Sequence, residues 1–119
     1  MSNDVKVNFG VPAAMNNYPA AMSACFVSKR YLAAGTSLVF TGPGGVHTVV
    51  IGTKATSGVV ELFDDSSISS PSNQIAKIDA SVIGWFLLDV TVVNGLVITL
   101  TNAPDVTISV IARDASLYN

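Results

Sequence analysis

The chain has 119 residues, of which six are Lys or Arg and eight are Asp or Glu, and half of its residues are hydrophobic. This length corresponds to one domain of roughly 100–150 residues, and the hydrophobic content excludes a disordered, charge-rich segment. A net charge of −2 with few, scattered basic residues argues against binding to nucleic acid or to an anionic membrane surface. We therefore expect one folded domain whose surface carries unusually little charge.

The order of the hydrophobic residues predicts no membrane-spanning segment. Glycine, proline and polar residues interrupt the apolar stretches before they reach the ~20 residues that a spanning helix needs. The first residues lack the pattern of a signal peptide. Cys25 is the only cysteine, so no intrachain disulfide can form. We expect a chain that is made and folded in a cytoplasm.

The first twenty residues stand apart from the rest. Apolar side chains alternate with polar or small ones at Val5, Val7, Phe9 and Val11, and Pro12 ends the pattern. We expect residues 1–20 to form an extended N-terminal arm and residues 21–119 to form a single β-sandwich domain. An ordinary edge strand or a loose terminus is one interpretation of the arm. The other is a segment that adds a strand to the sheet of a neighbouring subunit.

Seventeen Val, eight Ile and nine Thr residues favour β-sheet throughout the remaining chain. Alternating side chains and intervening turns predict strands at residues 22–32, 37–41, 46–53, 58–64, 74–79, 85–93, 96–101 and 106–113. Short strands at this spacing are typical of a sandwich or barrel. We expect an all-β antiparallel sandwich of about eight strands in two four-stranded sheets.

Two features near the C-terminus are the most regular. The last strand has apolar residues at every second position, namely Val106, Ile108, Val110 and Ala112, which is the pattern of a half-buried strand. Asn94-Gly95 precedes residues 96–101 and is a strong signal for a two-residue hairpin. We therefore predict that residues 85–93 pair with residues 96–101.

His47 and Cys25 are the residues best suited to nucleophilic or metal chemistry. His47 is the only histidine, and no second His or Cys nearby completes a zinc site, so a structural histidine is favoured. Cys25 lies among apolar residues and is interpreted as a small buried hydrophobe. A nucleophile–base pair formed by Cys25 and His47 has no sequence motif in its support.

The acidic residues allow two further interpretations. Asp64 and Asp65, followed by Ser66 and Ser67, could bind calcium, but the loop lacks the spacing of an EF-hand, and hydrogen bonds to the turn backbone are favoured. Paired acids of a glycosidase could come from the predicted strands, at Glu61, Asp79 and Asp89. Nothing in their spacing selects this role. We expect no enzyme activity, no metal and no cofactor.

Trp85 is the most informative single residue. If Phe86 and Leu88 face the core, Trp85 and Leu87 face outward, whereas the opposite orientation makes Trp85 an ordinary core residue. Exposed aromatic anchors are enriched at protein interfaces. The predicted interaction residues are therefore Val5, Val7, Phe9, Val11, Trp85 and Leu87.

Two segments carry distinctive combinations of strand and turn motifs. The first, residues 45–54 and 58–67, has a strand with Gly-Val-His, a Gly-Thr turn, and a strand that ends in Phe-Asp. In the second, residues 86–90, 94–98 and 103–110, Gly-Leu opens one strand and Asp-Val-Thr opens the last. Together these motifs resemble those of small capsid decoration (cement) proteins of tailed bacteriophages. Pro104 departs from this pattern.

This resemblance implies a jelly-roll-like sandwich that binds the outside of a phage head. The implied partners are the major capsid protein and further copies of the chain, with a homotrimer favoured, and the implied location is the virion exterior after synthesis in a bacterial host. No functional residue is carried over from the motifs. The alternative is a head-fibre or tail module that binds a host glycan or receptor, with Trp85, Tyr31 or Tyr118 lining a groove.

Overall fold

A computed structural model describes residues 26–102 and 104–119 as an all-β fold, as the sequence predicts. Its strands are β1 (Val27–Tyr31), β2 (Gly35–Thr41), β3 (Gly44–Thr53), β4 (Val59–Phe63), β5 (Gln74–Asp79), β6 (Gly84–Val92), β7 (Gly95–Thr101) and β8 (Asp105–Ala112). A short 3₁₀ turn, Ala115–Leu117, follows β8. Cys25 and the predicted arm, with Val5, Val7, Phe9 and Val11, lie outside the described residues.

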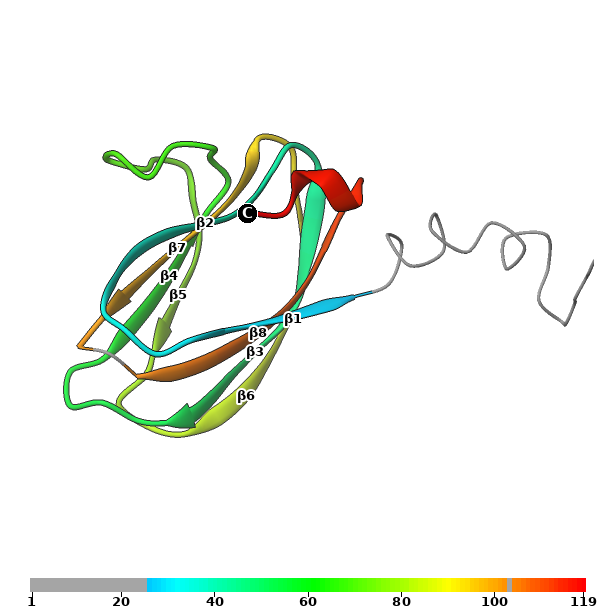
Figure 1. Ribbon diagram of the computed structural model, residues 1–119. Coiled ribbons are helices and arrows are strands. Elements are labelled where there is room, and N and C mark those ends of the chain that lie inside the picture. Colours follow the sequence, from blue (N-terminus) through cyan, green and yellow to red (C-terminus); the bar gives the residue numbers. More distant parts are fainter. Residues whose placement is uncertain (1–25, 103) are drawn as a thin grey trace, which may run out of the picture.

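The eight strands form two antiparallel sheets that face each other (Figure 1). Sheet A has the strand order β1-β8-β3-β6, and sheet B has the order β2-β7-β4-β5. Among these strands only β4 and β5 follow one another within one sheet, and every other connection crosses between the sheets. This order is that of a jelly roll, which consists of two Greek keys. The predicted sandwich is therefore confirmed.

The hydrophobic core lies between the sheets and follows from the alternation along each strand. In β8, the side chains of Val106, Ile108 and Val110 are fully buried, and the residues between them are half-buried on the outer face. Sheet B contributes Leu62 and Ile98 to the same core. Because side chains alternate between the two faces of a strand, each sheet also has an outer face that the core does not occupy.

The prediction that residues 85–93 and 96–101 pair in a hairpin at Asn94-Gly95 is wrong. Strand β6 pairs with β3 in sheet A, whereas β7 pairs with β2 and β4 in sheet B. The Asp64 carboxylate accepts hydrogen bonds from the backbone amides of Val93 and Asn94, which holds the turn where the chain changes sheets. A side chain at Gly95, whose φ is 143°, would lie 2.7 Å from the Phe40 carbonyl oxygen, so this position needs glycine.

Strands β1 and β6 are the edges of sheet A, and β2 and β5 are the edges of sheet B. After β8, the chain returns toward sheet B, where Tyr118 forms an isolated bridge with Phe40. Within the described part of the chain, no helix has the length and apolar character needed to cross a membrane.

Candidate functional site

Strand β6 presents large apolar side chains to solvent. Its residues alternate between half-buried and exposed from Gly84 to Thr91, with Phe86 and Leu88 packed against the core. Trp85 and Leu87 point the other way and are 63% and 55% exposed. Trp85 and Leu87 therefore face outward, which is one of the two strand orientations that the sequence left open.

The exposed residues of β6 continue into the loop before it. Val82 and Ile83, in the β5–β6 connection, are 56% and 66% exposed. We call Val82, Ile83, Trp85 and Leu87 the apolar strip. Val50, opposite Trp85 on β3, extends it inward across the outer face of sheet A. Contiguous exposed apolar side chains of this kind mark contact sites more often than scattered ones.

A bulge brings His47 and Asp89 together on the same outer face. Between the pairs Val46–Val90 and Thr48–Leu87, one residue of β3 stands opposite two residues of β6. His47 is also the extra residue of β3 relative to β8. Asp89 has a φ of 48°, in the left-handed region that Asp tolerates better than most residues. Its carboxylate contacts the Nδ1 atom of His47.

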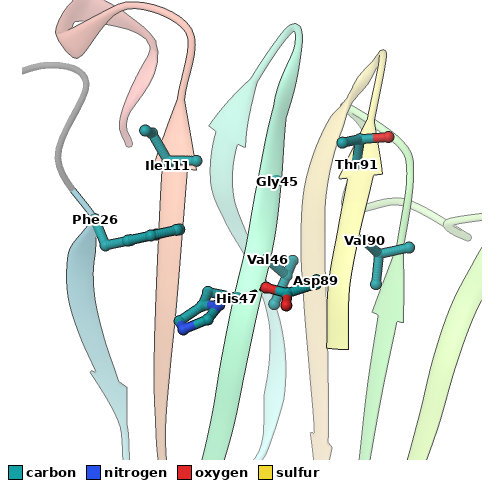
Figure 2. A pocket seen from close by; sticks show the side chains of 8 residues that line it. All are labelled: Phe26, Gly45, Val46, His47, Asp89, Val90, Thr91 and Ile111. Atoms are coloured by element: carbon teal, nitrogen blue, oxygen red, sulfur yellow. Dashed lines mark hydrogen bonds and ion pairs between the residues drawn. The ribbon is translucent and has the colours of Figure 1, made fainter. Parts of the chain in front are cut away.

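The His47 ring lies beside a small hollow in the outer face (Figure 2). The imidazole stacks on Phe26, with the ring centroids 4.7 Å apart. The hollow has a volume of about 200 Å³, and its lining includes Gly45, Thr91 and Ile111. We call it the His47 hollow. In Figure 2, Phe26 and Ile111 lie on one side of His47, and Asp89 and Thr91 lie on the other.

Two acidic groups on this face each have a side-chain partner. Arg30 on β1 donates hydrogen bonds from Nε and Nη2 to the two carboxylate oxygens of Asp105, at 3.0 and 2.8 Å. The hydrogen bonding to Arg30 lowers the pKa of Asp105. Asp89 has His47 as its partner. Asp105 and Asp89 therefore each lie beside a basic side chain, which lowers the desolvation cost of covering these carboxylates with another surface.

Asp65 and Asp64 hold turns, as the favoured interpretation of their loop predicts. The Asp65 carboxylate accepts hydrogen bonds from the backbone amides of Ser66, Ser67 and Ser72, and these bonds, that from Ser72 first, lower the pKa of Asp65. Asp64 accepts from the amides at the end of β6. The described residues contain no group of three or more His, Cys, Asp or Glu side chains able to hold a metal ion.

The three acids considered for a glycosidase do not meet at one site. Glu61 and Asp79 lie on β4 and β5 of sheet B, and Asp89 lies on β6 of sheet A. In the β4–β5 register, Glu61 stands opposite Lys77. Asp79 accepts hydrogen bonds from the Ser81 hydroxyl and, with a smaller effect, from the Ser81 amide, and both lower the pKa of Asp79. Asp89 is therefore separated from the other two acids, and Asp79, which shares the outer face of sheet B with Glu61, is already engaged by Ser81.

The aromatic residues considered for a glycan groove are also separated. Tyr31 and Tyr118 are partly buried and pack against the core. The Tyr118 hydroxyl accepts a hydrogen bond from the Ala112 amide, and its ring meets Phe40 edge-on. Trp85 is exposed on the apolar strip. Phe26 also lines the His47 hollow, although it was not among the aromatic residues considered for a glycan groove.

The contact between His47 and Asp89 is the main feature that sequence reasoning missed. These residues are 42 positions apart, and their meeting depends on the β3–β6 register and the bulge within it. The usable signal was that the only histidine and an acid on a predicted outward position could share a face.

The chain matches no protein-family model and no curated protein sequence.

Proposed function

We propose that this chain is a structural virion protein, a decoration protein that binds the outer surface of a tailed-phage head and stabilises it. The observation that carries the proposal is the apolar strip, in which four large side chains are each more than half exposed on and beside one edge strand. The jelly-roll architecture supports it, since viral capsid domains share that architecture. The motif resemblance supplies the phage context.

The apolar strip would provide most of the contact energy. Complete burial of a side chain such as Leu or Phe contributes roughly 1.5–3 kcal/mol, and aromatic anchors at the centre of an interface dominate binding. Trp85 is such an anchor, and Leu87 lies next to it on the same face of β6. The low charge of the chain suits a surface that is covered after assembly, because burying unpaired charges is costly.

The partners in this proposal are the major capsid protein and further copies of the chain. The resemblance favours a homotrimer on the head. The proposal also includes the predicted arm, whose residues 5–11 would add a strand to a neighbouring sheet. Deleting residues 1–12 should then weaken attachment to heads and leave the sandwich folded, and unchanged occupancy on purified heads would rule out this role of the arm.

Substitutions on the apolar strip test the main proposal. Purified heads that lack the chain are incubated with the wild type, with the double variant Trp85→Ala, Leu87→Ser, or with Ile68→Ser, and bound protein is quantified after sedimentation. Ile68 is as exposed as Leu87 but lies in the β4–β5 loop, so its variant is the matched control. We expect the double variant to bind at least tenfold more weakly and the control to bind normally.

Wild-type occupancy by the double variant would contradict the role of the apolar strip. The location itself is tested by cryo-electron microscopy of the virion that contains the chain. Density for the sandwich on the head exterior, with β6 toward the shell, is the expected result. Density on the tail alone would contradict the proposed location and would identify a tail component, instead of the capsid, as the partner.

A further inference from the structure

We propose that the free edge of β6 accepts residues 5–11 of a neighbouring copy of the chain as a further strand of sheet A. This contact specifies the edge and the segment through which copies associate, and so deepens the proposed function. It rests on the proposed function for one step, the choice of a neighbouring copy over the same chain. The contact itself does not require attachment to a phage head.

Three of the four sheet edges have features that block pairing with another strand. β1 has only five residues, two of which, Lys29 and Arg30, are charged. β5 has six residues and carries Lys77. Part of the β2 edge is covered by the C-terminus, since the Asn119 amide donates a hydrogen bond to the Val39 carbonyl. Short strands, charged side chains and covering segments are the usual means by which proteins block an edge.

Strand β6 lacks these features. It has nine residues, with no Lys or Pro and with Asp89 as its one charged residue. Its only strand partner in the described part of the chain is β3 (Figure 1). Phe86 and Leu88 pack against the core but are only half-buried. A further strand would therefore pair with the free backbone groups of β6 and cover apolar side chains on both of its faces.

The sequence of residues 5–11 suits such a strand. In an extended chain its apolar residues share one face, and its polar or small residues share the other. One antiparallel register matches both faces of β6 before its bulge. The pairs on the inner face are Phe9–Phe86 and Val7–Leu88, and the pairs on the outer face are Gly10–Trp85 and Asn8–Leu87.

This register combines residues that stabilise a sheet. Apolar and aromatic side chains meet on the inner face, and such cross-strand pairs are favourable. On the outer face, Trp85 can pack over Gly10, and an aromatic residue opposite glycine compensates for the missing side chain. Lys6 follows next in the register and approaches Asp89 at the bulge, where its charge is opposite to that of the carboxylate.

The linker between residues 5–11 and β1 favours a neighbouring copy. Residues 12–25 lead to Phe26, which precedes β1 at the edge of sheet A opposite β6, and they can span roughly 45 Å. In the register above, residue 11 lies beside Gly84, at the other end of the sheet from Phe26. Within one chain the linker would cross the outer face of sheet A and cover the apolar strip. Pairing with a neighbour leaves this strip free for the head.

The contact also agrees with the favoured oligomer. It joins an arm of one copy to an edge of the next, so its two sides are different surfaces. Contacts of this heterologous kind close into a ring when the rotation between copies allows it. A homotrimer is such a ring.

Disulfide trapping between two variants of the full chain, without heads, tests the contact. Both variants carry Cys25→Ser, which removes the native thiol, and one adds Asn8→Cys while the other adds Leu87→Cys. Directly opposed strand residues lie within the distance that a disulfide spans. We expect peptide mapping of the mixture to show a disulfide between positions 8 and 87.

Ser28→Cys is the matched control for Leu87→Cys, because Ser28 is also exposed on an edge strand but lies on β1. The yield with Leu87→Cys should be at least about tenfold higher, because paired strands hold the two thiols at an effective concentration near the millimolar range.

Proline substitutions provide a second measurement. Val7→Pro removes a backbone donor from the proposed strand, whereas Ala14→Pro introduces proline into the linker. Sedimentation velocity of the full chain should show self-association about tenfold weaker for Val7→Pro and unchanged for Ala14→Pro. Circular dichroism should show the same sandwich in both variants.

The proposal is overturned if the disulfide between positions 8 and 87 forms no better than the control. It is also overturned if this disulfide forms only within a chain that carries both substitutions, because the arm would then pair with its own sheet. Loss of head binding with this disulfide intact would contradict the proposed attachment and support the strand addition. Head binding without the disulfide would support the attachment and contradict the strand addition.

Discussion

Apolar side chains on the outer faces of the two sheets differ in their exposure to solvent. On sheet B, Val97 of β7 points away from the core and is nevertheless fully buried, because Leu38 of β2 and Phe63 of β4 stand on either side of it in the register. On sheet A, Trp85 and Leu87 also point away from the core, but they lie on an edge strand and remain more than half exposed.

This difference separates side chains whose burial stabilises the fold from side chains that the fold leaves in solvent. The neighbours of Val97 already exclude water from it, so its burial contributes to folding. The exposed part of Trp85 contributes nothing to folding until another surface covers it. The same alternation of residues therefore buries an outward-facing side chain on sheet B and leaves large apolar side chains exposed on sheet A.

The largest effect is expected for Val97→Ala. Removing two buried methyl groups should lower the free energy of unfolding by about 2 kcal/mol through lost transfer energy and a residual cavity. Urea denaturation followed by tryptophan fluorescence measures the change. A loss below about 0.5 kcal/mol, the usual range for surface substitutions, would mean that the outer face of sheet B is not self-covered as described.

A smaller effect is expected at a polar pair beside Val97. The hydroxyl groups of Thr36 and Thr99 lie 2.9 Å apart in a partly buried hydrogen bond on the same face. Thr99→Val keeps the size of the side chain but removes this bond, which should lower the free energy of unfolding by about 1 kcal/mol. Thr107→Val on the outer face of sheet A is the control, and an equal loss there would show that the Thr36 partner is irrelevant.

Strand positions were predictable from the sequence, but the pairing of two strands was not. Period-two alternation in residues 106–113 identified β8 and its buried face, since both depend only on neighbouring residues. Asn94-Gly95 has the local chemistry of a hairpin. Its actual turn is determined by the Asp64 carboxylate, about thirty residues earlier in the chain, and no local pattern reports a contact of that range.

In the candidate site, too, one feature could be predicted from the sequence and another could not. The orientation of Trp85 follows from the alternation of β6 once one face is known to meet the core, so the sequence could state it as one of two alternatives. The contact of His47 with Asp89 requires a bulge that shifts the register between β3 and β6. A one-residue change of register moves side chains to the opposite face, so the sequence could suggest that the two residues share a face but could not predict that they are in contact.

An acid titration should show how much the Asp65 loop, beside sheet B, contributes to the stability of the fold. The pKa of Asp65 lies below its ordinary value of 3.8 because backbone amides bind the carboxylate. Its ionised form therefore stabilises the fold at neutral pH, and this contribution is lost as the pH falls below about 4. Asp65→Asn should lower the melting temperature at pH 7 and reduce its dependence on pH between 5 and 2.5.

Glu61→Gln, which removes an acid without such backbone hydrogen bonds in the described structure, is the comparison for Asp65→Asn. A melting temperature that falls equally steeply with acid in the wild type and in Asp65→Asn would contradict the role assigned to these amides. The effect should be modest in either case, because interactions of exposed charges are screened by solvent.

The smallest effect on the stability of the isolated chain is expected for Leu87→Ser. The Leu87 side chain is 55% exposed, so its replacement should change the free energy of unfolding by no more than about 0.5 kcal/mol at low protein concentration. If copies associate through the apolar strip, the wild-type midpoint should rise with protein concentration, and the midpoint of Leu87→Ser should rise less. A large loss of stability that is independent of concentration would instead place Leu87 with Val97, among the residues that the fold itself requires.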